Sequence, residues 1–381
     1  MDFSLSDEQR RLREEIITFA RNELNDDVAV RDEDGTFPVD AWKKCAAMGI
    51  QGLTVPQAFG GGGADPLTTM LAMEALGYGC TDNGLIFSLQ AQMWSCQTPI
   101  VRFGSTEQRQ RYLPGLCDGS LIGVQAMTEP GSGSDAFSLT TSAERSGEGF
   151  LLSGTKTFIT NAPVADVFVM FASTDPGRGF AGISAFVVDR DAPGLSVGRP
   201  FHKMGLRTSP MAEVVVDGCF VPDSNLLGPL GAGMAIFNHS MTWERSCILA
   251  SAIGTMDRQL ERCVGYARER QQFGQPIGKF QAVSHRIADM KVRLETARLL
   301  LYRQGWQMSQ SRPSSLDAAM VKLHISESFV QSSLDALQIH GAYGYMTEME
   351  IEREVRDAIG SRIYSGTSDV QRNVIAGLMG L

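Results

Sequence analysis

The chain has 381 residues, with 34 Lys and Arg against 43 Asp and Glu, which gives a formal net charge of −9. Such an acidic chain lacks the basic footprint of a general nucleic-acid-binding protein. Its seven cysteines are scattered without a CxxC spacing, which argues against a disulfide framework or a metal site and indicates the reducing cytoplasm. No apolar run reaches the roughly 18 residues of a membrane span, so no membrane association is expected.

The elements predicted along the chain are helical, then extended, then helical again. Residues 1–120 carry apolar side chains at helical spacing, and Ser4 or Ser6 is placed to cap the first helix. Residues 121–229 contain short runs rich in β-branched and aromatic residues without long helices between them, at 167–171, 183–188 and 213–216. This pattern predicts an antiparallel, barrel-like β-domain rather than a doubly wound sheet.

In residues 230–381 the helical pattern returns, and turn signals at 274–276, 311–313 and 341–344 divide it into four long helices. We therefore expect a mainly α protein with three domains. These are an N-terminal α-domain (1–120), a central β-domain (121–229) and a C-terminal four-helix bundle (230–381).

A glycine-rich segment, Gly131–Ala136 (GSGSDA), matches the letters of the dinucleotide-binding motif G-x-G-x-x-A. A Rossmann site needs a helix directly after the glycines and an acidic residue about 20 positions further on. Here the following residues read as extended, and residues 151–153 are Leu, Leu and Ser. The segment is therefore interpreted as a plain turn, or as a loop whose backbone N–H groups approach a planar or anionic ligand.

Five motifs, in this order along the chain, resemble the acyl-CoA dehydrogenase family. They are Met127–Asp135 (MTEPGSGSD), Lys156–Asn161 (KTFITN), Arg270–Gly274 (RQQFG), Gln338–Gly341 (QIHG) and Tyr364–Arg372 (YSGTSDVQR). Together they span most of the chain. The resemblance implies the same three-domain architecture, a homotetramer and an FAD cofactor that supplies the redox chemistry.

The resemblance also implies which residues hold FAD. The loop Met127–Ser134 would meet the flavin ring from one side, and Phe158 and Thr160 would flank the other. Arg270 and Phe273 would reach the adenosine diphosphate half of an FAD in a neighbouring subunit. The expected cofactor-binding residues are Met127, Thr128, Gly133, Ser134, Phe158, Thr160, Arg270, Phe273, Ile277, Gln338, Gly341, Thr367 and Asp369. By its chemistry Arg270 suits a pyrophosphate, although a solvated helix charge is the alternative.

Most family members carry a catalytic Glu in the C-terminal signature, where this chain has Ser365. Glu244 is the candidate replacement, because it shares an apolar helix stripe with Phe237, Met241 and Ile248 and has no basic neighbour one turn away. Such a carboxyl should have a raised pKa, as a general base requires. A minority of members, similar to isovaleryl- and long-chain-type dehydrogenases, place their base on this helix just before an Arg, as here. The alternative is a structural Glu satisfied by a distant Arg or by solvent.

With Glu244 as base, the resemblance implies α,β-dehydrogenation of an acyl thioester. Glu244 would take the α-proton while the β-hydrogen leaves as hydride to the flavin. The developing oxyanion would accept a hydrogen bond from the backbone N–H of Ser365, which a side-chain substitution does not remove. Trp243, Arg245 and Ser365 are expected to line the substrate pocket, although Trp243 is as readily a packed core aromatic.

Shorter matches at 159–168, 243–244 and 361–367 look like one subgroup, the prolyl-carrier-protein dehydrogenases of pyrrole-forming pathways. This resemblance implies oxidation of an L-prolyl group on a peptidyl carrier protein toward a pyrrolyl thioester. One alternative is an acyl-CoA dehydrogenase for a branched or longer acyl chain. Another is an inactive flavin- or thioester-binding protein. The electron acceptor, an electron-transfer flavoprotein or oxygen, stays open.

Overall fold

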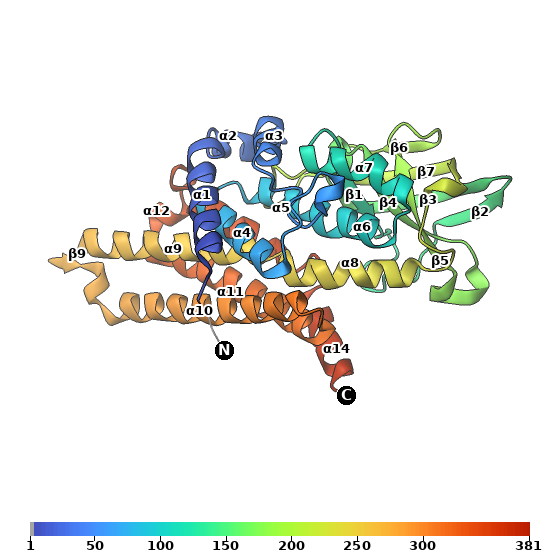
Figure 1. The fold of residues 1–381 in the computed structure, drawn as a ribbon. Coiled ribbons are helices and arrows are strands. Elements are labelled where there is room, and N and C mark those ends of the chain that lie inside the picture. Colours follow the sequence, from blue (N-terminus) through green and yellow to red (C-terminus); the bar gives the residue numbers. More distant parts are fainter. Residues whose placement is uncertain (1–3) are drawn as a thin grey trace.

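The computed structural model describes residues 4–381 and begins with a layer of short helices (Figure 1). These helices are α1 (Asp7–Glu23), α2 (Val28–Asp34), α3 (Val39–Ala47), α4 (Pro66–Gly79), α5 (Asn83–Ala91), α6 (Thr98–Phe103) and α7 (Thr106–Asp118). Of the two expected caps, Ser6 is the one used. Its hydroxyl accepts from the backbone N–H of Gln9, whose side chain accepts in return from the N–H of Ser6.

The central region folds into one eight-stranded sheet in the order β6-β7-β3-β2-β4-β5-β8, with β1 paired to β4. Its strands are β1 (Gly123–Ala126), β2 (Ser142–Ser146), β3 (Gly149–Thr160), β4 (Val167–Ser173), β5 (Ile183–Asp189), β6 (Leu195–Val197), β7 (Met211–Pro222) and β8 (Leu226–Leu227). The three strand segments expected from the sequence lie within β4, β5 and β7. The mainly α fold with a central β-domain is thus confirmed.

The expectation of an antiparallel sheet was wrong in the middle of the strand order, where the sheet is mixed. β1 runs parallel to β4, with Gly123 opposite Val167, and β2 meets β4 in parallel at Ser142 and Ser173. Parallel neighbours need a long connection, and the whole β2–β3 hairpin lies between β1 and β4. The other strand pairs are antiparallel.

The C-terminal region consists mainly of long helices. They are α8 (Gly233–Cys247), α9 (Ala250–Glu269), α10 (Gln281–Ser309) and α11 (Ser315–His340), followed by α12 (Ala342–Tyr345), α13 (Ile351–Gly360) and α14 (Ser368–Leu378). A hairpin of β9 (Gln271–Gln272) and β10 (Gln275–Pro276) joins α9 to α10 at the end of the molecule opposite the β-domain (Figure 1). The three expected turns are present, but the break between α8 and α9 at Ile248 and Leu249 contains no Gly or Pro and was missed.

The two helical regions share one hydrophobic core. Trp42 and Met73 of the N-terminal helices belong to the same buried cluster as Ile253, Leu294 and Ile325 of the bundle. Two further clusters lie against the sheet. The seven cysteines are buried free thiols. Between residues 4 and 381, no helix has the length and hydropathy of a membrane span, and no cluster of His, Cys, Asp and Glu is arranged to hold a metal ion.

Candidate active site

Glu244 lies where α8 meets the N-terminal helices and the C-terminal signature. Ser95 Oγ donates to one carboxylate oxygen at 2.6 Å, and Ser365 Oγ donates to the other at 2.5 Å. Within residues 4–381, no Lys, Arg or His nitrogen lies within 4 Å of this carboxylate. Within these residues the carboxylate is thus held by two serine hydroxyls and not by an Arg.

The surroundings of Glu244 move its pKa in opposite directions. Burial raises the pKa of the carboxyl, whereas hydrogen bonds from Ser365 and Ser95 and the charges of Arg245 and Lys322 lower it. Burial is the larger effect, so the pKa lies above the usual value for Glu. A carboxylate with a raised pKa can accept a proton from carbon and release it again near neutral pH.

Ser95 reaches Glu244 from a π-helical segment, η2 (Gln92–Gln97), between α5 and α6. Pro99 has no N–H and its ring would clash with the carbonyl of Ser95 in a regular α-helix. The Gln125 side chain donates to that carbonyl at 3.2 Å, so the carbonyl oxygen is still satisfied. The proline thus explains a local widening of the helix, a feature that often occurs at functional sites.

Ser365 lies in a strained turn between α13 and α14. Its φ is 57° and that of Gly366 is 86°, the left-handed region that non-glycine residues rarely adopt. Gln371 Nε2 donates to both carbonyl oxygens of this turn at 3.0 Å, and Lys322 Nζ donates to that of Gly366 at 2.7 Å. Within residues 4–381, the backbone N–H of Ser365 takes part in no hydrogen bond. It is therefore free to donate to a developing oxyanion.

A buried ion pair anchors the glycine-rich loop that follows β1. Lys156 Nζ lies 2.8 Å from Glu129 Oε1, and both side chains are almost fully buried. Glu129 also accepts from the backbone and hydroxyl of Thr140 and from the backbone of Thr141. Burial alone would raise the pKa of Glu129, but these partners lower it to about 2. The exposed tip of the loop, with Gly133 and Ser134, is thus presented from a fixed base.

The opposite wall of this region comes from an irregular part of β3. The pairing of β3 with β7 shifts register between Lys156 and Ile159, and Phe158 within the shift has a φ of 55°. Such bulges re-aim side chains, and the Phe158 side chain is 61% exposed beside Phe201. The N–H of Thr157 donates to the carbonyl of Thr128, which ties the bulge to the glycine-rich loop.

The structure divides the expected cofactor-binding residues into two groups. The first group lies in the glycine-rich loop, at the end of β3 and at the start of α14, and consists of Met127, Thr128, Gly133, Ser134, Phe158, Thr160, Thr367 and Asp369. The second group lies near the β9–β10 hairpin and consists of Arg270, Phe273, Ile277, Gln338 and Gly341. Gln338 is sixteen residues beyond Lys322 on α11, or about 24 Å along the helix. Thr367 and Asp369 therefore lie far from Gln338 and Gly341 within one chain.

The three residues expected in the substrate pocket are adjacent to the carboxylate or bound to it. Trp243 stacks on the buried Trp94 with ring centroids 6.1 Å apart, so it packs against the core. The Nε of Arg245 is buried, with no hydrogen-bond partner in the part of the chain that the structure describes. Ser365 binds Glu244 directly.

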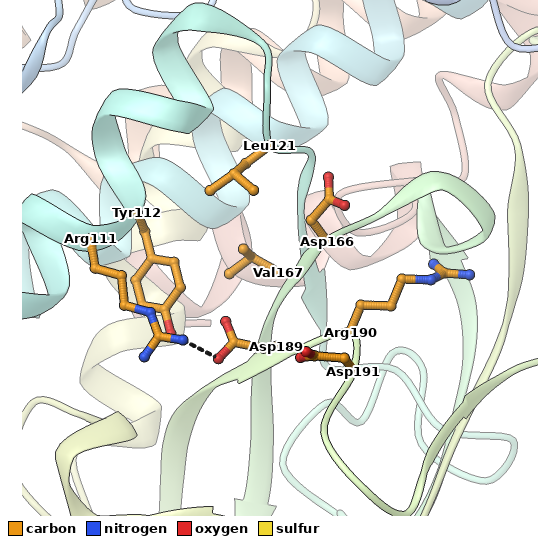
Figure 2. A pocket seen from close by; sticks show the side chains of 8 residues that line it. All are labelled: Arg111, Tyr112, Leu121, Asp166, Val167, Asp189, Arg190 and Asp191. Carbon is orange, nitrogen blue, oxygen red and sulfur yellow. Dashed lines mark hydrogen bonds and ion pairs between the residues drawn. The ribbon is translucent and has the colours of Figure 1, made fainter.

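Two cavities differ in their relation to this site. A cavity of about 440 Å³ lies between α7 and the strands β4 and β5 (Figure 2). Arg111 pairs there with Asp189 at 2.6 Å, and none of the expected site residues lines it. A cavity of about 20 Å³ is lined among others by Phe87, by Ile248 at the end of α8 and by Tyr364 next to Ser365. It has room for about one water molecule.

Comparison with known proteins places this geometry in a family. Three acyl-CoA dehydrogenase domains match in order: the N-terminal domain at residues 6–120, the middle domain at 124–219 and the C-terminal domain at 231–379. The L-prolyl-[peptidyl-carrier protein] dehydrogenase of Serratia sp. is 45% identical, with 100% of this chain and 99% of that protein covered. The chain belongs to the acyl-CoA dehydrogenase family.

Solved structures of two relatives superpose over the full length of this acyl-CoA dehydrogenase family protein. The prolyl acyl carrier protein oxidase AnaB is 47% identical, with a TM-score of 0.98 and coverage of 99% of this chain and 100% of that one. PigA, solved with FAD and proline, is 44% identical with a TM-score of 0.98 and complete coverage of both chains. The domain boundaries at 120 and 229 stay a prediction.

Three residues of this acyl-CoA dehydrogenase site were missed in the sequence. Ser95 holds the carboxylate, and Lys322 and Gln371 hold the strained turn. Lys322 carries a readable signal, since none of its helix neighbours three or four residues away is acidic although the stretch is apolar. The same reasoning had singled out Glu244. Ser95 and Gln371 are common polar residues whose sequence context gives no comparable signal.

Proposed function

We propose that this acyl-CoA dehydrogenase family protein oxidises an L-prolyl group, held as a thioester on a peptidyl carrier protein, toward the pyrrolyl thioester. FAD is its cofactor. The observation that carries the proposal is the Glu244 carboxylate, which has a raised pKa and is held by the hydroxyls of Ser95 and Ser365. The full-length similarity to the Serratia dehydrogenase and to AnaB supports the choice of substrate.

The residues of the two groups fit FAD by their chemistry. The exposed ring of Phe158 and the glycine-rich loop offer a flat face and backbone N–H groups to a polar ring system. Arg270 is exposed and, between residues 4 and 381, has no carboxylate within 4 Å, so its guanidinium can bind a pyrophosphate. When bound, FAD accepts the β-hydrogen of the substrate as a hydride.

The chain's own residues perform the remaining steps. Glu244 Oε1 or Oε2 removes the α-proton, and the hydroxyls of Ser95 and Ser365 keep the carboxylate oriented toward it. The backbone N–H of Ser365 donates to the thioester oxygen as negative charge develops there. Trp243 and Arg245 flank the base in the sequence of α8. The buried, unpartnered Nε of Arg245 makes this residue the better candidate for the pocket, since Trp243 packs on Trp94.

Two observations disfavour the alternatives. A branched or longer acyl-CoA is disfavoured because the prolyl-carrier-protein dehydrogenase of Serratia sp. is 45% identical, whereas an acyl-CoA dehydrogenase of Bacillus subtilis is 38% identical. An inactive binding protein would have no need of the costly unpaired carboxylate of Glu244.

The assembly proposed here is a homotetramer. The far group of cofactor-binding residues then serves an FAD whose flavin lies in a neighbouring subunit. Phe273 at the hairpin is 93% exposed, and α10 exposes Val292, Leu299 and Trp306 at seven-residue spacing along one face. An electron-transfer flavoprotein or oxygen accepts the electrons. The buried free thiols agree with the cytoplasm as the place of action.

The proposal is tested by the identity of the electron donor. FAD-loaded protein is mixed anaerobically with prolyl-carrier protein, with the same carrier lacking the prolyl group, and with branched and long-chain acyl-CoAs. We expect the flavin absorbance to bleach only with the prolyl-carrier protein. Bleaching by an acyl-CoA, without bleaching by the prolyl-carrier protein, would overturn the proposed substrate.

A further inference from the structure

Lys322 is a fully buried lysine on α11, directly beneath the strained turn. Its Nζ donates to the carbonyl of Gly366 at 2.7 Å and lies 5.9 Å from the centre of the Tyr364 ring. Within the described residues 4–381, no carboxylate lies within 4 Å of it. Burying an ammonium group without an ion pair costs several kcal/mol in general. A compensating role in the site is therefore expected.

Three charged groups act on Lys322. Glu244 and Arg245 face it from α8, and Glu327 lies on its own helix. Glu327 already accepts from Arg362 Nε at 3.0 Å and from Ser368 Oγ at 2.7 Å. Glu244 is thus the acidic neighbour that has no cationic partner of its own in the part of the chain that the structure describes.

The hydrogen bond from Lys322 reaches the residue next to Ser365, which carries the hydroxyl and the backbone N–H of the site. The Gly366 carbonyl directly follows the Ser365 carbonyl along the backbone. There is no room for a side chain at Gly366, because its Cβ would come within 2.6 Å of Gln371 Nε2. The turn is therefore tightly confined between Lys322 and Gln371. A shift of the Gly366 carbonyl would move the free N–H of Ser365 and the hydroxyl that holds Glu244 together.

We propose that Lys322 is a positioning residue of the reaction, whose buried ammonium group fixes the Ser365–Gly366 turn and adds to the positive charge of Arg245 near Glu244. The inference deepens the proposed function and rests on it, because it assigns Lys322 a role through the base and the oxyanion donor. Burial lowers the pKa of Lys322 to about 8, so the group is still mostly charged at neutral pH. Its charge lowers the pKa of Glu244, and its removal must raise that pKa.

The test compares three variants that separate charge from hydrogen bonding. Lys322→Met removes both, Lys322→Gln keeps an amide donor but no charge, and Lys322→Arg keeps both. Each FAD-loaded variant is titrated by infrared difference spectroscopy against the same protein with Glu244→Gln, which isolates the Glu244 carboxyl signal. Thermal unfolding identifies the variants that fold. If Lys322→Met does not fold, Lys322→Gln still decides the test.

We expect the pKa of Glu244 to rise in Lys322→Met and Lys322→Gln and to stay near the wild-type value in Lys322→Arg. With prolyl-carrier protein, the acid limb of kcat/KM should move to higher pH in step. A wild-type pKa of Glu244 in folded Lys322→Gln would overturn the inference. The infrared titration needs no substrate, so it still decides the role of Lys322 if the proposed substrate proves wrong.

Discussion

Ser365 contributes to the site through two groups that depend on different parts of the protein. Its hydroxyl donates to Glu244, whereas its backbone N–H is set by a turn that Gln371 and Lys322 hold. A signature Glu at this position would be the base itself. With a Ser at this position, the carboxylate of Glu244 on α8 gains a hydrogen-bond donor, and the backbone N–H of residue 365 stays in place. Proton removal by Glu244 and stabilisation of the oxyanion by the N–H are therefore both compatible with Ser365.

Removing the other donor should change the pH dependence of the enzyme. In Ser95→Ala the carboxylate of Glu244 loses a hydrogen bond that lowers its pKa, so the pKa rises. The base is then protonated over a wider acid range, and kcat/KM should fall at pH 6 but approach the wild-type value at pH 9. The measurement is the pH profile of kcat/KM with prolyl-carrier protein.

Ser246→Ala is the matched control for this experiment. Ser246 is an equally buried serine of α8, but its hydroxyl donates to the Thr242 carbonyl and accepts from Gln304 rather than contacting Glu244. In Ser246→Ala, the acid limb of the pH profile of kcat/KM should stay at the wild-type position. An equal loss at every pH in Ser95→Ala would contradict the assigned effect on Glu244.

At the level of elements, the glycine-rich loop depends on the Glu129–Lys156 pair for its position. The pair joins the segment after β1 to the middle of β3, and both charges are almost fully buried. Glu129 has its pKa lowered to about 2, below its value of 4.5 in the unfolded chain. Its contribution to stability is therefore complete above about pH 4.5 and is lost as the pH falls toward 2.

Lys156→Met should destabilise the protein strongly, because it leaves Glu129 as a buried charge without its partner. We expect a loss of about 3–5 kcal/mol in the free energy of unfolding, measured by chemical denaturation. Arg145→Met breaks the exposed pair with Asp223 in the same domain and should cost less than about 1 kcal/mol. Similar losses in the two variants would contradict the anchoring role.

Elements with a strong local pattern could be predicted from the sequence, and elements set by distant contacts could not. The bundle helices follow their hydrophobic periodicity, and β4, β5 and β7 contain the expected runs of β-branched and aromatic residues. The π-helical η2 depends on Pro99 together with Gln125 across the fold, and the α8–α9 break lacks any Gly or Pro. The parallel pairing of β1 depends on which strand lies beside it, which local sequence does not encode.

The site shows the same division between local pattern and distant contact. Glu244 could be found because an unpaired carboxylate on an apolar stripe is unusual in any helix. Its partners Ser95 and Ser365 lie 149 and 121 residues away in the chain, and only the fold brings their hydroxyls to it.

Across the whole molecule, the two groups of expected cofactor-binding residues lie at opposite ends of the helical bundle. One group lies beside the β-domain and the other lies near the β9–β10 hairpin (Figure 1). The sequence order of the motifs could not show this separation, because α9, α10 and α11 run past each other over most of their length. A single chain thus offers a complete base and oxyanion donor beside the β-domain, and a second set of groups at the β9–β10 hairpin. This arrangement favours shared sites between neighbouring subunits.

The central claim is that Glu244 of α8 is the base of the reaction. The most direct measurement is the rate of anaerobic flavin reduction after rapid mixing of FAD-loaded protein with prolyl-carrier protein. Glu244→Gln should slow this step by about 10²–10⁴-fold with the flavin still bound, because a carboxamide cannot take the α-proton. The control Glu261→Gln, on the exposed side chain that accepts from Tyr78, should reduce its flavin at the wild-type rate. Flavin reduction in Glu244→Gln within tenfold of the wild-type rate would contradict the claim.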